Sequence, residues 1–167
     1  MAIEHNIIPP ANMHAVYSAT YASEAARITA AASLVASTDV GRIVFQTDVG
    51  SSWIFDGAVW RHMSGPRPLH TVAGTAYTVA QTDLDATLET TGSSAVTITL
   101  PAAASGWPKI GDAVEFIQGG TGLLTIAHAL GTGSIKSSGT LVSKGQYAFL
   151  AAKYISADLW FVTGDRA

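Results

Sequence analysis

The chain has 167 residues, of which 48% are hydrophobic and only 13% are charged. A typical soluble domain carries about 25% charged residues, so we expect part of the surface to be buried against other subunits. The formal net charge is −3 and the sequence has no Lys/Arg cluster, which argues against nucleic-acid binding. Cysteine is absent, which excludes disulfides and thiolate metal sites.

The N-terminal residues 1–6 are polar and of mixed charge. A secretory signal instead has a basic segment followed by an apolar one. No apolar run approaches the roughly 18 residues that a membrane span needs. We therefore expect a chain that is made in the cytoplasm and does not enter a membrane.

Residues 1–14 are predicted to form an extended arm, because Pro9-Pro10 is incompatible with a helix interior. The segment is either a disordered tail or an arm that docks on a neighbouring subunit. Apolar side chains favour docking, because contact with a neighbouring subunit would bury their apolar surface. The arm carries Ile3, Ile7 and Ile8.

Residues 15–36 are predicted to form a helix that begins near Asn12, a candidate N-cap. Alanine between the larger side chains adds helix propensity. The stripe is narrow, so we expect the helix to lie on a sheet or on a partner helix. The residues at helical spacing are Tyr17, Tyr21, Ala25, Ile28, Ala32 and Val35.

Residues 40–63 change to strand signals and are predicted to form a meander of three short strands. The Asp56-Gly57 pair between apolar runs is a strong hairpin signal. We expect Trp53 and Trp60 to pack with Phe45. Residues 64–70 contain two prolines and a glycine and are predicted to be a linker between this part, residues 15–63, and the rest.

Residues 71–167 are predicted to form an antiparallel β domain, either a sandwich or a small barrel-like fold. Turn signals recur at roughly ten-residue intervals, and Gly119-Gly120-Thr121-Gly122 is interpreted as a hairpin turn. The fold class is therefore mainly β with one helix. The predicted strands are 75–80, 86–91, 95–100, 112–118, 122–127, 133–137, 145–153 and 158–163.

Two stretches carry a resemblance to phage proteins. Residues 39–60 contain a β run ending in Gln-Thr-Asp, an aromatic run, Asp-Gly and a closing Trp. This order resembles a small β module of phage tail and fibre proteins. Residues 107–165 resemble a tail-fibre or head-fibre β domain. Their pattern is Gly-Thr-Gly before Leu-Leu-Thr-Ile, then Gly-Gln-Tyr, and finally Asp-Leu-Trp-Phe-Val-Thr-Gly-Asp. The resemblance implies a virion-surface structural protein that is commonly trimeric.

The chain is short and starts almost at the first module, which favours a capsid decoration (cement) protein or head fibre over a long tail fibre. Its N-terminal part would attach to the capsid after synthesis in the host cytoplasm. The expected partners are two further copies in a homotrimer and the major capsid protein or neighbouring virion proteins. The candidate attachment residues are Ile3, Ile7, Ile8, Tyr17, Tyr21 and Ile28.

No catalytic, cofactor-binding or metal-binding residue is predicted, so we expect a protein that is not an enzyme. The histidines lack the spacing of metal ligands, and Asp83 and Asp85 are interpreted as turn caps. No Gly-x-Ser-x-Gly is present. Two alternatives remain: a small receptor-binding tail fibre that contacts host glycans, with Trp107 as the candidate contact, and a polysaccharide-degrading enzyme whose acidic pair assembles only on folding.

Overall fold

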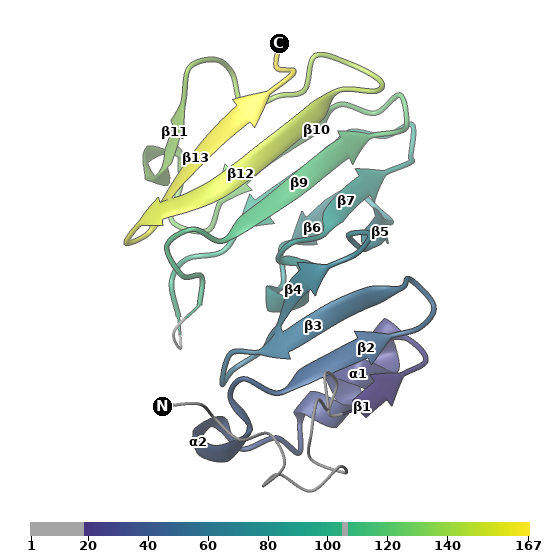
Figure 1. Ribbon diagram of the computed structural model, residues 1–167. Helices are drawn as coiled ribbons and strands as arrows, with labels where there is room; N and C mark the ends of the chain where they lie inside the picture. The colour runs from purple at the N-terminus through teal and green to yellow at the C-terminus, as the bar shows by residue number, and fades with distance from the viewer. Residues whose placement is uncertain (1–18, 105–106) are drawn as a thin grey trace, which may run out of the picture. The chain divides into compact units, whose positions relative to one another are not determined.

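The structure, a computed structural model, describes residues 19–104 and 107–167. The predicted arm lies outside the described residues, and so do its Ile3, Ile7 and Ile8 and the candidate Tyr17. The chain is mainly β, as predicted, and divides into two compact units, Met1–Pro66 and Arg67–Ala167 (Figure 1).

The N-terminal unit contains a four-stranded sheet in the order β1-β2-β3-β4. Strands β2, β3 and β4 form the predicted antiparallel meander, and β1 pairs in parallel with the outer edge of β2. The elements are β1 (Ala19–Tyr21), α1 (Glu24–Ala31), α2 (Ala36–Asp39), β2 (Ile43–Gln46), β3 (Ser51–Phe55) and β4 (Trp60–Ser64).

The prediction of one helix over residues 15–36 is wrong in its extent. Residues Ala19–Tyr21 form strand β1, and α1 begins only at Glu24. Ser23 is the N-cap, since its backbone is extended and its hydroxyl accepts a hydrogen bond from the Ala26 amide at 3.3 Å. The helical spacing across Tyr21 was misleading because pairing with β2 satisfies the backbone there.

The core of the N-terminal unit consists of Val44, Trp53, Phe55 and Trp60. The ring centroids of Phe55 and Trp60 are 5.5 Å apart. The expected packing of Phe45 is wrong, because alternation along β2 buries Val44 and places Phe45 on the other side of the strand. The Asp56-Gly57 turn is present, with the Asp56 carboxylate accepting the amides of Ala58 and Val59.

The C-terminal unit contains two sheets whose strands alternate along the chain. One sheet has the order β11-β13-β12-β9-β7-β5 and the other β10-β8-β6 (Figure 1). The strands are β5 (Leu69–Val72), β6 (Ala76–Thr78), β7 (Thr87–Thr90), β8 (Val96–Leu100), β9 (Ala113–Gln118), β10 (Leu124–His128), β11 (Ile135–Ser137), β12 (Phe149–Ser156) and β13 (Leu159–Gly164), with single 3₁₀ turns η2 (Gln81–Asp83) and η3 (Thr132–Ser134).

The prediction that this unit is antiparallel is wrong. Strands β5, β7 and β9 are parallel neighbours in one sheet, and β6, β8 and β10 are parallel neighbours in the other. The chain therefore winds through three coils, β5–β6, β7–β8 and β9–β10, and each coil stacks on the one before. This is the winding of a short β-solenoid. No closed barrel is formed by the described strands.

Among the described strands of this unit, antiparallel pairing involves β12 with its two neighbours, β9 and β13. Strand β12 pairs with β9, and β13 pairs with β12. Most predicted strand positions agree with the structure, but residues 145–148 precede β12 as a loop. Strand β5 was missed, because its first residues, Leu69 and His70, fell within the stretch interpreted as a linker.

Both sheets contribute side chains to one core cluster. Alternation along each strand supplies them: in β9, Val114 and Phe116 are buried while Glu115 and Ile117 between and after them are not. Trp160 is fully buried, and its indole NH donates to the Pro101 carbonyl at 3.1 Å. Alternation along the strands therefore accounts for which side chains form the core, although the strand direction differs from the expectation.

The glycine run 119–122 is not a hairpin turn, because β9 and β10 lie in different sheets. It is the corner of the third coil and lies directly on the corner of the second. The amide of Gly120 donates to Thr90 at 2.8 Å, and that of Gly122 to Gly92 at 3.1 Å. A Cβ atom on Gly120 or Gly122 would overlap backbone atoms of residues 91–94, so the two backbones approach too closely for any side chain.

We predict that Gly122→Ala lowers the free energy of unfolding by more than the ~1–3 kcal/mol typical of side-chain overpacking, because the added methyl meets backbone that cannot rotate away. Gly133→Ala is the matched control, since a Cβ atom added there would have no neighbour within 4 Å. Urea unfolding followed by tryptophan fluorescence measures both. Equal effects of the two substitutions would contradict the close stacking of the corners.

Candidate binding surfaces

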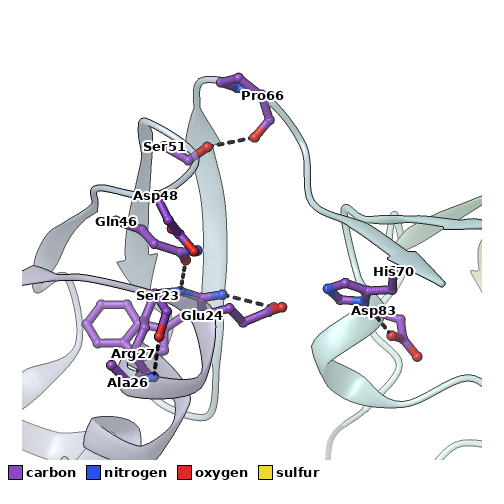
Figure 2. Close-up of polar contacts among 11 residues, drawn as sticks. Ser23, Glu24, Ala26, Arg27, Gln46, Asp48, Ser51, Pro66, His70 and Asp83 are labelled. Atoms are coloured by element: carbon purple, nitrogen blue, oxygen red, sulfur yellow. Dashed lines mark hydrogen bonds and ion pairs between the residues drawn. The ribbon is translucent and has the colours of Figure 1, made fainter.

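A buried arginine fixes helix α1 to its sheet. Arg27 is only 3% exposed, and its guanidinium carbon lies 3.6 Å from the ring centroid of Trp53. Its Nε donates to the side-chain oxygen of Gln46 at 2.9 Å. A terminal nitrogen contacts the Glu24 carboxylate at 3.3 Å (Figure 2). The backbone carbonyl of Arg27 accepts the indole NH of Trp60 at 3.1 Å.

Burial lowers the pKa of Arg27 to about 10, against the opposing effect of the Glu24 and Asp48 carboxylates. The guanidinium is therefore still charged at neutral pH. Gln46 links it to Asp48, whose carboxylate accepts the Gln46 amide at 2.8 Å. The cluster has a complete set of local partners, so we interpret it as the link between α1 and the sheet and not as a ligand site.

The described attachment candidates, Tyr21 and Ile28, differ in exposure. The Tyr21 ring packs edge-on against Trp60 at 6.5 Å between centroids, so much of it belongs to the core. Ile28 is 36% exposed on α1. Sequence reasoning missed the more exposed apolar residues that follow the helix, Val35 at 54% and Val40 at 57%, because Val35 was assigned to a continuous helical stripe.

A second polar cluster joins the first coil of the C-terminal unit. Asp83 is 1% exposed and accepts the Ala80 amide at 2.7 Å, as expected of a capping carboxylate. The same carboxylate lies 2.9 Å from Nδ1 of His70 (Figure 2), and it accepts the Tyr77 hydroxyl at 2.8 Å. Sequence spacing gave no sign of this cluster, since folding brings β5, β6 and η2 together.

The six-stranded sheet has an outer face that turns away from the core and mixes apolar with charged side chains. Phe149 is 41% and Phe161 42% exposed on it. Phe161 pairs in register with Lys136 and Lys153, and Glu115 is paired with Arg67 at 3.1 Å. We define the outer face by Thr87, Glu89, Ala113, Glu115, Ile117, Lys136, Phe149, Ala151, Lys153, Phe161 and Thr163.

The predicted glycan contact, Trp107, is half-buried and packs against the core cluster. It is more exposed than Trp53, Trp60 and Trp160, which are buried, but its packing against the core leaves its ring only partly accessible. A different aromatic residue, Tyr147, is 77% exposed. It lines a shallow open pocket of about 370 Å³ together with Lys144, Gly145, Gln146, Ala148 and Asp165.

Within residues 19–104 and 107–167, no group of three or more histidine and acidic side chains is arranged to hold a metal ion. His128 is one example of a histidine in a structural role. It lies buried with Nε2 at 3.1 Å from the Pro101 carbonyl, and its Nδ1 accepts the Leu130 amide at 3.0 Å. No helix in the described part of the chain is long and apolar enough to cross a membrane.

In comparisons with known proteins, no protein-family model matches the chain and no curated protein is significantly similar to it.

We predict that Arg27→Met lowers the free energy of unfolding by about 2–3 kcal/mol, because it removes a hydrogen bond from a charged donor and a desolvated cation–π contact. Arg27→Lys should destabilise too, since an ammonium group does not reproduce the planar stacking on Trp53. Arg42→Met is the control. Its ion pair with Asp39 is 43% exposed on the arginine side, and such pairs contribute at most ~1 kcal/mol. Urea unfolding monitored by tryptophan fluorescence compares the three, and equal losses would contradict the assignment.

Proposed function

We propose that this chain is a structural protein of a bacteriophage particle, a capsid decoration (cement) or head-fibre protein on the virion surface. The observation that carries the proposal is the pair of exposed phenylalanines, Phe149 and Phe161, on the outer face of a chain with only 13% charged residues. A surface of this kind favours burial in an assembly. The module resemblance in residues 39–60 and 107–165 supplies the kind of assembly.

The proposed assembly is a homotrimer joined through the outer face. In a cyclic trimer each contact joins two different parts of the subunit surface. The apolar side chains Phe149 and Phe161 would supply buried area, and Lys136 and Lys153 would be the polar groups beside Phe161. A specific interface needs roughly 800 Å² from each partner, and a six-stranded sheet offers a surface of that order.

The N-terminal unit is the proposed attachment part, and the C-terminal unit the displayed part. Ile28, Val35 and Val40 are the exposed apolar residues that support attachment to the major capsid protein. The arm with Ile3, Ile7 and Ile8 would add apolar area. For the C-terminal unit we propose the layering of a two-sheet sandwich, built from stacked parallel coils and closed by the β12–β13 hairpin.

We assign no catalytic role to the chain. The His70–Asp83 pair is the arrangement most similar to a catalytic dyad, but the carboxylate also binds Tyr77 and the Ala80 amide. Those bonds join β5, β6 and η2, which supports a role in holding the first coil. A receptor-binding tail tip is the second candidate function, and the exposed Tyr147 pocket favours it.

We predict that the purified protein is a trimer at micromolar concentration and that Phe161→Asp converts it to a monomer, because a carboxylate would be buried in the interface. Light scattering coupled to size-exclusion chromatography measures the mass. Leu130→Asp is the control, since Leu130 is 62% exposed and lies outside the outer face. A monomeric native protein at this concentration would refute the trimer.

We predict that particles lacking this protein lose surface density and release their DNA at a lower temperature, and that added native protein restores both. Ile28→Asp and Val35→Asp should prevent rebinding, because they place charge on the proposed contact. Leu130→Asp should rebind normally. Cryo-EM and thermal-release assays provide the readouts. Unchanged density and unchanged thermal release in the deletion particles would refute the decoration role, and binding of the protein to host cells alone would favour the tail-tip function.

A further inference from the structure

Tyr147 combines high exposure with an unfavourable backbone conformation. Its ring is 77% exposed, and its φ is +68°, in the left-handed region that favours glycine. A bulky side chain rarely adopts this region, and the cost of a non-glycine residue there is about 1–2 kcal/mol. Such strain is found mainly at functional sites. A tyrosine kept here, with its ring in solvent, has no packing role that explains it.

The loop that presents Tyr147 is fixed by hydrogen bonds from Tyr147 and from the residue before it. The Tyr147 amide donates to the Gln118 carbonyl at 2.6 Å, and the side-chain amide of Gln146 donates to the Gly119 carbonyl at 2.8 Å. Gln118 is itself buried and held by the Ser143 hydroxyl. The site is therefore built on the end of β9 and the glycine corner, so the ring position is set before any ligand arrives.

Two further hydrogen bonds hold the lining residues Lys144 and Asp165. The Lys144 amide donates to the Asp165 carbonyl at 3.0 Å, and one carboxylate oxygen of Asp165 accepts the Phe149 amide at 3.1 Å. The side chains of Lys144, Gln146 and Asp165 are exposed at the pocket. Together they present an ammonium, an amide and a carboxylate beside an aromatic ring.

We propose that this pocket binds one pyranose ring of a neutral carbohydrate, stacked on Tyr147. A pyranose has an apolar face that an aromatic ring covers and a rim of hydroxyls that need both donors and acceptors. Lys144 and Gln146 donate, and Asp165 and Gln146 accept. The lining carries one positive and one negative side chain, so it has no net charge to select an anionic ligand. The volume of about 370 Å³ lies near the lower end for small-molecule sites.

The site deepens the receptor-binding alternative and does not depend on the decoration role. Sugar binding is measured on isolated protein, whereas decoration is measured on particles. Failure of one measurement therefore leaves the other standing.

The test is a titration of the native, isotope-labelled protein with methyl glycosides of glucose, galactose and N-acetylglucosamine, followed by amide chemical shifts in NMR spectra. We expect at least one glycoside to shift the amides of residues 144–148 and 165, with a Kd on the order of 1 mM for a single ring in an open pocket. Tyr147→Phe should retain the shifts, because the stacking ring remains.

Tyr147→Gly should abolish the shifts while the Tm stays the same or rises, because glycine relieves the positive φ. Loss of binding together with an unchanged or higher Tm distinguishes a ligand-binding residue from a structural one, because loss of a structural residue would lower the Tm. Phe161→Ala, which removes an aromatic ring 42% exposed on the outer face, should leave the shifts unchanged. The proposal is overturned if no glycoside shifts these amides at tens of millimolar, if glycerol or N-acetylneuraminic acid alone does so, or if Tyr147→Gly binds like the native protein.

Discussion

The close approach of one coil corner to the next is the constraint on which the C-terminal unit depends. Gly120 and Gly122 allow the backbone of the third coil to hydrogen-bond directly to residues 90–92 of the second. That contact fixes the register of β9 on β7 and of β10 on β8. With the register fixed in both sheets, the inward side chains meet in one core. Any side chain at these glycines would separate the coils and shift both sheets at once.

The N-terminal unit depends on a different interaction, the contact of one buried arginine with the sheet. Its sheet is small and its helix α1 is only eight residues long, too short to be stable in isolation. Arg27 supplies the missing attachment by stacking on Trp53 and bonding Gln46. A buried cation is costly unless its donors are satisfied, and here the carboxylates of Glu24 and Asp48 offset part of that cost. The helix is therefore specified by one polar contact as much as by apolar packing.

The surfaces proposed for function in the C-terminal unit follow from the same strands and corner that form its core. The outer face follows from strand alternation: once Val114, Phe116 and Leu150 point inward, Ile117, Phe149 and Phe161 must point outward. The Tyr147 loop follows from the end of β9, where Gln118 and Gly119 provide its anchoring carbonyls. The same coil that closes the core thus positions both the proposed subunit contact and the proposed sugar platform.

Local sequence signals determined the mainly β class, most of the strand positions and the Asp56-Gly57 hairpin, because alternation and turn chemistry act between residues close in the chain. They failed for β1 and β5, which are short and become strands only by pairing with β2 and β7. They also failed for strand direction, since alternation is the same in parallel and antiparallel sheets. The corner role of Gly119–Gly122, the Asp83 cluster and the exposed Tyr147 site each join segments distant in sequence. Only the tertiary structure determined these three features. Burial, the close approach of two backbones and the positive φ of Tyr147 depend on neighbours that the chain brings together by folding.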